Sequence, residues 1–295
     1  MSSYLIVSDA TCDLPESYAR EHNLHIIPMT YLVDGQDYHG DLTLHDFYDK
    51  MRAGSMTTTS QITPAQFVDY FSDLFERYEE DIIYLGFSSA LSGTVGNAAV
   101  AAKMLKESYP DRTLHVIDSY AASLGEGLFV HEVLRRREEG LSCEDTAHWA
   151  EAHAQTICHY FTVDDLNFLH RGGRVSKATA VVGTMLGIKP LLHVNEAGQL
   201  INIGKVRGRR SSLDWLVDRM EAKLSATGLE EKTIFIGHGD CIEDARYVAS
   251  LVKKRFGVKD KDIYIDYIGP VIGSHSGPGT VALFFVGPDR TETGR

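Results

Sequence analysis

The sequence lacks the signatures of the common enzyme families. Its 295 residues contain no GxSxG nucleophile elbow, no GxxxxGKS/T phosphate loop and no GxGxxG dinucleotide-binding turn. The 13 histidines form no HExxH pair, and neither His22/His25 nor His148/His153 has a spacing suited to zinc. The motifs therefore give no support for a serine hydrolase, a nucleotide-binding enzyme or a zinc enzyme.

Cysteine, basic residues and long apolar runs are also sparse. The four cysteines are scattered without a CxxC spacing, so we expect a reducing, cytoplasmic location. The first residues, MSSYLIVSDATCD, contain only a four-residue apolar run, which predicts neither a signal peptide nor a membrane span. With 41 acidic and 29 basic residues the formal net charge is −12. This charge argues against non-specific binding to nucleic acid, and we expect at most a transient contact with a membrane.

The length and composition are those of a globular protein with two domains that share a cleft. Apolar residues make up 43% of the chain and charged residues 24%. The first half alternates short apolar runs with helical patterns, which predicts an α/β/α domain with a parallel sheet over residues 1–158. The second half is patterned differently, and it predicts an α+β domain with a mixed sheet over residues 159–295.

In the first half, buried strands are predicted over residues 4–7, 25–33, 81–86 and 114–117. Asp13 is expected to cap a helix that Pro15 opens, and Thr63 to Gln66 have the spacing of a capping box with proline at the first helical position. A later helix should stop at Gly140.

In the second half, Ser142 is expected to cap a helix over residues 142–157. A short strand over 160–163 follows, and strands over 189–195 and 199–206 should form a hairpin around Glu196-Ala197-Gly198. The remaining predicted elements are strands over 233–236, 263–268 and 281–286 and helices over 211–226 and 242–256.

Polar turns follow three of the predicted strands: SDATCD (8–13), SSALSGT (88–94) and DSYAAS (118–123). Ligands of parallel sheets bind outside the carboxyl ends of the strands, so these turns should crowd one edge, and TTTSQIT (57–63) could join them. Ser88, Ser89, Ser92 and Thr94 offer hydroxyls beside the free N–H groups of a helix N-terminus. This turn is either a binding site for a carboxylate or phosphate, or a helix cap without a ligand.

Two basic clusters stand out in an acidic chain. Arg171 and Arg174 surround a glycine pair in FLHRGGRVS (168–176), ahead of a helix predicted from the apolar residues between Val175 and Leu186. Either they lie at the edge of an anion-binding site, or they are solvated side chains at a helix end. The run KVRGRR (205–210) is either a solvated charge run or a docking surface for an acidic partner.

His275 lies in GSHSGPG (273–279), which is predicted to be a glycine-rich turn at the exit of a strand. Both His275 and His238 are either structural or close to a ligand. Asp9, Asp13 and Asp118 could gather at the sheet edge and hold Mg²⁺. In that alternative the chain is a stand-alone metal-dependent phosphotransferase or hydrolase for a small substrate, with His275 as the base.

Six segments, in order along nearly the whole chain, resemble the DegV family of bacterial fatty-acid-binding proteins. They are SDATCDL (8–14), TTSQ (58–61), SSALSGT (88–94), VIDS (116–119), LHRGGRVS (169–176) and GSHSGPGTVALFF (273–285). The resemblance implies two α/β domains with an acyl chain in a tunnel between or beneath them. It also implies that the chain is no enzyme itself and has no metal or cofactor. Its role would be to present a long-chain fatty acid to a separate fatty acid kinase subunit for acyl-phosphate formation in phospholipid synthesis.

The resemblance also implies which residues hold the carboxylate. The hydroxyl of Thr59 or Ser60 and that of Ser92 would bind it, helped by the N–H groups of Ser92 and Gly93, and His275 would lie close by. Arg171 and Arg174 would face the head group or the kinase. Two positions depart from the family pattern: Ile62 and Thr63 precede Pro64 where proline and serine are usual, and Ser276 replaces a threonine. A signalling or scaffold protein that only senses lipid is a third interpretation.

Overall fold

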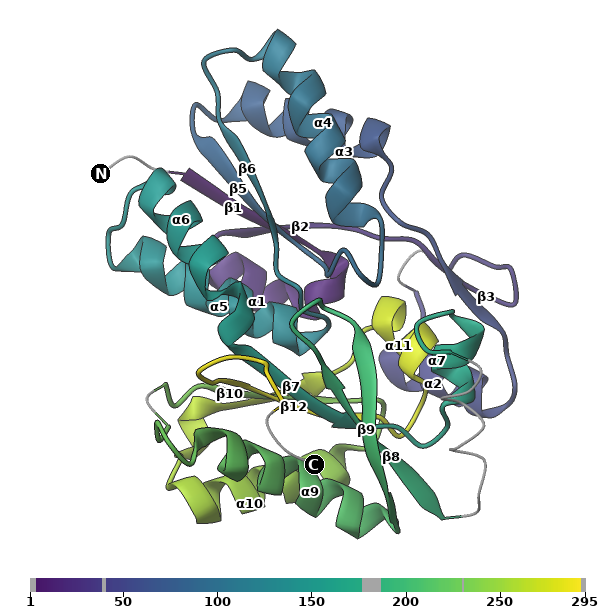
Figure 1. The fold of residues 1–295 in the computed structure, drawn as a ribbon. Helices are drawn as coiled ribbons and strands as arrows, with labels where there is room; N and C mark the ends of the chain where they lie inside the picture. The colour runs from purple at the N-terminus through teal and green to yellow at the C-terminus, as the bar shows by residue number, and fades with distance from the viewer. Residues whose placement is uncertain (1–3, 39–40, 177–186, 230, 293–295) are drawn as a thin grey trace.

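The computed structural model describes residues 4–38, 41–176, 187–229 and 231–292. In this part of the chain a four-stranded sheet and a six-stranded sheet lie on either side of helix α5 (Leu124–Glu138), as Figure 1 shows. The smaller sheet is parallel and the larger is mixed. The predicted fold class, a parallel-sheet α/β domain followed by a mixed-sheet domain, is confirmed.

The parallel sheet has the strand order β2-β1-β5-β6. Its strands are β1 (Tyr4–Asp9), β2 (Leu24–Ile27), β5 (Asp81–Gly86) and β6 (Leu114–Asp118). Both faces of β1 are buried, because α3 (Pro64–Arg77) and α4 (Thr94–Ser108) cover Leu5 and Val7 on one side. On the other side, α5 and α6 (Cys143–His153) cover Tyr4 and Ile6, and the short α1 (Glu16–Glu21) packs at β2.

The mixed sheet has the strand order β11-β10-β12-β7-β8-β9. Its strands are β7 (Ile157–Thr162), β8 (Ile188–Val194), β9 (Leu200–Arg207), β10 (Ile234–His238), β11 (Ile263–Tyr267) and β12 (Val281–Val286). Helices α9 (Arg209–Leu224) and α10 (Ile242–Phe256) pack on its outer face. Its inner face packs against α5, so one continuous apolar core joins both sheets.

A third group of short elements lies beside the gap between the sheets. It consists of β3 (Tyr31–Val33), β4 (Thr57–Thr59), α2 (Leu44–Arg52), α7 (Asn167–Arg171) and α11 (Pro270–Ser276). Strands β3 and β4 pair as an antiparallel ribbon, and Phe47, Tyr48 and Met51 form a small core beneath it. Single turns of 3₁₀-helix occur at Ala10–Cys12, Ala154–Thr156 and Asp260–Asp262. The ribbon places Thr59 and Ser60 close to the site described below.

Several local predictions are confirmed. Thr63 and Gln66 form a reciprocal capping box at α3, with Pro64 at the first helical position. The Ser142 side chain caps α6, and β8 and β9 form the predicted hairpin. The described residues contain no helix with both the length and the apolar content needed to cross a membrane.

Three local predictions are wrong, and each error has a physical reason. Asp13 does not cap α1, because it adopts a left-handed conformation and its carboxylate accepts a hydrogen bond from Ser123 instead. The strand predicted over 25–33 is broken after Ile27, so its two halves join different sheets. His275 lies in helix α11 instead of a turn at a strand exit, and only Gly277 and Gly279 have positive φ there.

Two further predictions, a helix and a domain boundary, are neither confirmed nor contradicted by the structure. The helix predicted between Val175 and Leu186 falls largely on residues 177–186, which lie outside the described residues. Strand β7 begins at Ile157, so the predicted domain boundary after residue 158 falls inside this strand. The division into domains 1–158 and 159–295 stays a prediction, because the core around α5 is shared.

Candidate functional site

A cavity of about 340 Å³ lies where the polar turns of the parallel sheet meet the inner face of the mixed sheet. Thr11, Ser92 and Ser123 each line it, and they come from the three turns that follow β1, β5 and β6. The prediction that these turns crowd one edge is therefore confirmed. Thr59 and Ser60 complete the polar end, so the TTTSQIT segment does join them.

The turn between β5 and α4 contributes hydroxyl and N–H groups. The Ser92 hydroxyl lies 2.9 Å from the Thr94 hydroxyl and also accepts a hydrogen bond from the Thr94 N–H. Gly93 is the N-cap of the 15-residue helix α4 and has no side-chain cap. The Gln61 side chain packs directly on Gly93, since a Cβ at this position would come within 2.4 Å of the Gln61 side-chain oxygen. The free N–H groups of this first turn favour an anion.

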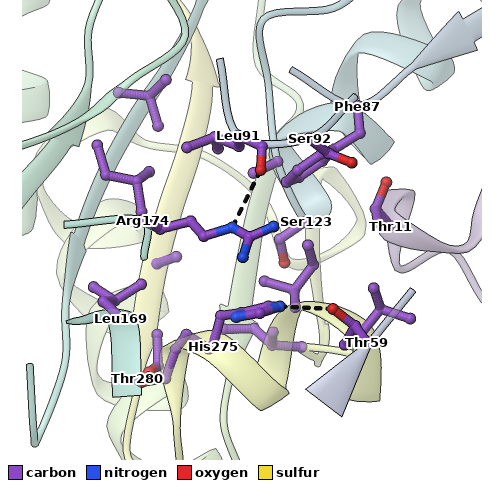
Figure 2. Close-up of a pocket in the computed structure, with 18 of the residues that line it drawn as sticks. Thr11, Thr59, Phe87, Leu91, Ser92, Ser123, Leu169, Arg174, His275 and Thr280 are labelled. Carbon is purple, nitrogen blue, oxygen red and sulfur yellow. Dashed lines mark hydrogen bonds between the residues drawn. The ribbon is translucent and has the colours of Figure 1, made fainter. Parts of the chain in front are cut away.

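His275 extends from α11 toward the same space (Figure 2). Its Nε2 lies 2.8 Å from the Thr59 hydroxyl, and the ring packs so closely on Gly172 that a Cβ there would lie 2.2 Å from Nδ1. Burial, together with the positive charge of Arg174, lowers the pKa of His275 to about 4. The imidazole is therefore neutral at physiological pH, and its hydrogen-bonding role depends on what the cavity holds.

Arg174 places a part-buried guanidinium at the cavity beside His275 (Figure 2). Its Nε donates to the Leu91 carbonyl at 3.1 Å and its Nη1 donates to the Gly172 carbonyl. No carboxylate pairs with it among the described residues, and burial alone lowers its pKa. A buried cation without a counter-ion is costly. The site is therefore electrostatically suited to an anionic group.

Most of the remaining lining is apolar, and His159, Ser276 and Thr280 are its polar members. Phe161, Val194 and Leu200 line it from the mixed sheet, and Val271 and Ile272 from α11. Further apolar lining residues are Met29, Phe87, Leu91, Leu169, Ile268, Ala282 and Phe284. One end thus offers hydroxyls, N–H groups and a positive charge, while most of the remainder suits hydrocarbon. This asymmetry suits an amphiphile with one anionic end.

The structure brings together six of the seven residues that the family resemblance assigns to the head group or its surroundings. Thr59, Ser60, Ser92, Gly93, His275 and Arg174 all line the cavity. Arg171 does not, because its guanidinium stacks on Phe168 outside at 4.5 Å from the ring centre and its Nη1 contacts the Met56 sulfur. Thr11, Ser123 and Gln61 were not predicted individually, although all three belong to polar turns that the sequence marks.

The three aspartates of the metal alternative are engaged elsewhere. Asp9 accepts hydrogen bonds from Thr11 and from the Tyr84 hydroxyl, Asp13 from Ser123, and Asp118 from backbone N–H groups that include that of Tyr120. They do not form a metal-ligand cluster. The only such cluster in the described ranges is His45, Asp49 and Asp240, where Arg52 already binds both carboxylates.

Of the remaining sequence candidates, His238, Arg209 and Arg210 have structural partners. His238 is buried, its Nδ1 accepts a hydrogen bond from the Cys241 N–H, and its ring packs on Tyr267. In the 205–210 run, Arg209 pairs with Asp164 and Asp244, and Arg210 lies over the Tyr247 ring. Lys205 and Arg207 are exposed. None of these residues lines the cavity.

Comparison with known proteins gives a consistent result. Residues 3–287 match the family model described as "Uncharacterised protein, DegV family". The DegV domain-containing protein CPE0026 of Clostridium perfringens is 41% identical over 97% of this chain and 98% of its own length. Among solved structures, a stearic-acid-binding protein from Eubacterium ventriosum superposes with a TM-score of 0.87 at 26% identity, covering 97% of this chain and 98% of that one. A fatty-acid-binding DegV family protein, SAG1342 of Streptococcus agalactiae, has a TM-score of 0.83 at 28% identity and covers 98% and 100%.

Proposed function

This chain belongs to the DegV family, and on that premise we propose that it binds one long-chain fatty acid in the cavity. The observation that carries the proposal is the guanidinium of Arg174, which has no carboxylate partner among the described residues and lies at the polar end of a largely apolar cavity. A carboxylate there would neutralise the charge, and the acyl chain would fill the apolar part. The two structural relatives whose names state fatty-acid binding support the same ligand.

The tail should supply most of the affinity and the polar end should fix the orientation. About 14 buried methylenes at about 0.8 kcal/mol each give about 11 kcal/mol before ordering costs. The carboxylate would accept hydrogen bonds from the Ser92 hydroxyl, from Thr59 or Ser60 and from the Gly93 N–H. Arg174 and the helix N-terminus both favour its ionised form.

Removing two of the hydroxyls tests the placement of the carboxylate. We expect Ser92→Ala combined with Thr59→Ala to weaken fatty-acid binding by about 10- to 100-fold, because two hydrogen bonds to a charged group are lost. Fluorescent fatty-acid displacement measures this change. Ser89→Ala is the matched control, since Ser89 lies on the same turn but is exposed and does not line the cavity. Equal affinity in the double variant and the control would argue against this position of the head group.

The titration of His275 gives a second test. Its pKa of about 4 in the free protein leaves the ring neutral, and a carboxylate bound beside it raises that pKa by favouring the imidazolium. The complex then holds more protons than the free protein, so affinity should rise by up to about tenfold as the pH falls from 7 to about 5.5. Calorimetry in buffers of different ionisation enthalpy should detect proton uptake in the wild type and none in His275→Gln. Uptake that persists in the variant would contradict the assignment.

The further part of the proposal is that the bound carboxylate is presented to a separate kinase subunit for acyl-phosphate formation in the cytoplasm. The absence of a nucleotide-binding motif supports a partner that brings ATP and Mg²⁺, and no cofactor of this chain is required. Arg171, Lys205 and Arg207 are exposed cations that suit an acidic partner. Reversing their charge should abolish kinase-dependent phosphorylation and leave fatty-acid affinity unchanged. Loss of lipid binding would instead link them to the cavity.

A further inference from the structure

The registers of the mixed sheet place several cavity-lining residues relative to one another. Thr280, just before β12, and Ala282 and Phe284 within it line the cavity in succession, and they follow α11, which carries His275. This run extends about 13 Å along the chain, leading away from α11. Phe284 pairs with His159 on β7. The register of Phe161 with Leu192 places Val194 opposite His159, and Val194 pairs with Leu200 on β9.

One row across the sheet therefore consists of Phe284, His159, Val194 and Leu200. All four residues line the cavity. Along β12 the row lies farther from α11 than the pair Ala282 and Phe161, by two residues or about 6.7 Å. His159 is its only polar member. The His159 residue is only 2% exposed and lies in an otherwise apolar row. A buried polar side chain in such surroundings is unusual and points to a specific role.

The His159 ring is held in one position from three sides. Its Nδ1 donates to the Ile157 carbonyl at 2.9 Å, which fixes the orientation of the imidazole. The ring meets Phe284 edge-on, with centroids 5.3 Å apart and an angle of 89°. Within the described part of the chain its Nε2 has no hydrogen-bond partner. Burial, together with the charge of the nearby Arg290, lowers the pKa of His159 well below its ordinary value, so the ring is neutral.

Gly125, in the first turn of α5, closes the space behind the ring. A Cβ at this position would lie 2.1 Å from His159 Nε2 and 2.7 Å from Phe284 Cδ1. The glycine thus allows the helix to press directly on both rings, and the helix backbone blocks any retreat of the imidazole from the cavity. A leucine at position 159 would fill similar space but would lack the hydrogen bond that fixes the ring.

We propose that His159, held by Gly125, Phe284 and the Ile157 carbonyl, is the end stop of the acyl cavity and a specificity-determining residue that sets the length of the bound chain. The inference rests on the proposed function and adds to it. The methyl end of the fatty acid contacts a rigid imidazole, so a longer chain must displace a locked ring, while a shorter one leaves apolar surface unfilled. Each methylene gained or lost changes Kd by about fourfold.

The test is the Kd of the full chain for dodecanoic, tetradecanoic, hexadecanoic, octadecanoic and eicosanoic acid. His159→Ala should shift the preferred acid to one about two methylenes longer, with a Kd ratio changed by about 15-fold. Gly125→Ala should shift it the other way, because both rings are pushed into the cavity. The double variant should return toward the wild-type preference, since the added methyl then occupies the space left by the imidazole. His159→Phe places a larger ring at this position and should favour shorter acids. This variant replaces His159→Ala in the test if His159→Ala does not fold.

His193→Ala is the matched control. His193 is also a buried histidine of this sheet, but it does not line the cavity, and the variant should keep the wild-type preference. A clear wild-type preference that is the same in every folded His159 and Gly125 variant would overturn the end-stop inference alone. A wild-type protein that binds none of the acids would overturn the proposed function and this inference together.

Discussion

Replacing Arg174 with methionine is expected to weaken fatty-acid binding by about 100-fold while the free energy of unfolding stays within about 1 kcal/mol of wild type. Binding should change far more than stability because the guanidinium has no carboxylate partner among the described residues, so the substitution breaks no ion pair of the fold. In the free protein its burial cost is offset by hydrogen bonds to the Leu91 and Gly172 carbonyls. In the complex it gains a charge-assisted hydrogen bond, and that gain is what the substitution removes.

Arg171→Met is the control for this prediction. It removes a neighbouring arginine of the same segment, but one that stacks on Phe168 outside the cavity, so binding should be unchanged. Titration calorimetry gives the affinities, and denaturant unfolding of both ligand-free variants gives the stabilities. A large loss of stability in Arg174→Met with little change in affinity would mean that this arginine serves the fold and not the ligand.

Arg290→Met is expected to lower the free energy of unfolding by about 3 to 5 kcal/mol. Arg290 is only 2% exposed and donates to the carbonyls of Ile157, Ala154, Ser119 and Tyr120. Burial lowers its pKa to about 10, so it stays charged at neutral pH. The four carbonyls belong to the start of the mixed sheet and to the turn after β6, so this one side chain ties the two sheets together. Removing it leaves buried acceptors without donors.

The comparison for Arg290 is Arg255→Met, which breaks an exposed ion pair with Asp218 and Glu221 and should cost less than about 1 kcal/mol. Arg290→Lys should also be destabilising, because a single ammonium cannot reach four carbonyls that a planar guanidinium spans. Chemical unfolding followed by circular dichroism measures all three variants. If Arg290→Met and Arg255→Met were equally stable, the role of Arg290 in joining the sheets would be excluded.

Local signals in the sequence were enough to predict much of the fold. The capping box at Thr63, the cap at Ser142 and the hairpin around Gly198 depend on residues close together in the chain, and all are present. The polar turns after β1, β5 and β6 were predictable as a common site because the carboxyl ends of parallel strands share one edge. Individual contributors such as Thr11 and Ser123 were marked only as members of those turns.

The features that escaped prediction depend on contacts between distant segments. Asp13 looked like a helix cap because its actual partner, Ser123, lies 110 residues away. His275 looked like a turn residue because glycines surround it, yet Gly273 permits close packing on Tyr48 and the segment is helical. His159 carries no local signal, and its place beside Phe284 in the cavity lining follows only from strand pairing.

The central claim, that this chain carries a long-chain fatty acid, is tested most directly by mass spectrometry of the organic extract of protein purified without detergent. The account predicts about one fatty acid per chain, with a narrow distribution of lengths and no comparable lipid in extracts of Arg174→Met. A wild-type protein that is folded, empty and unable to take up added fatty acid would contradict it.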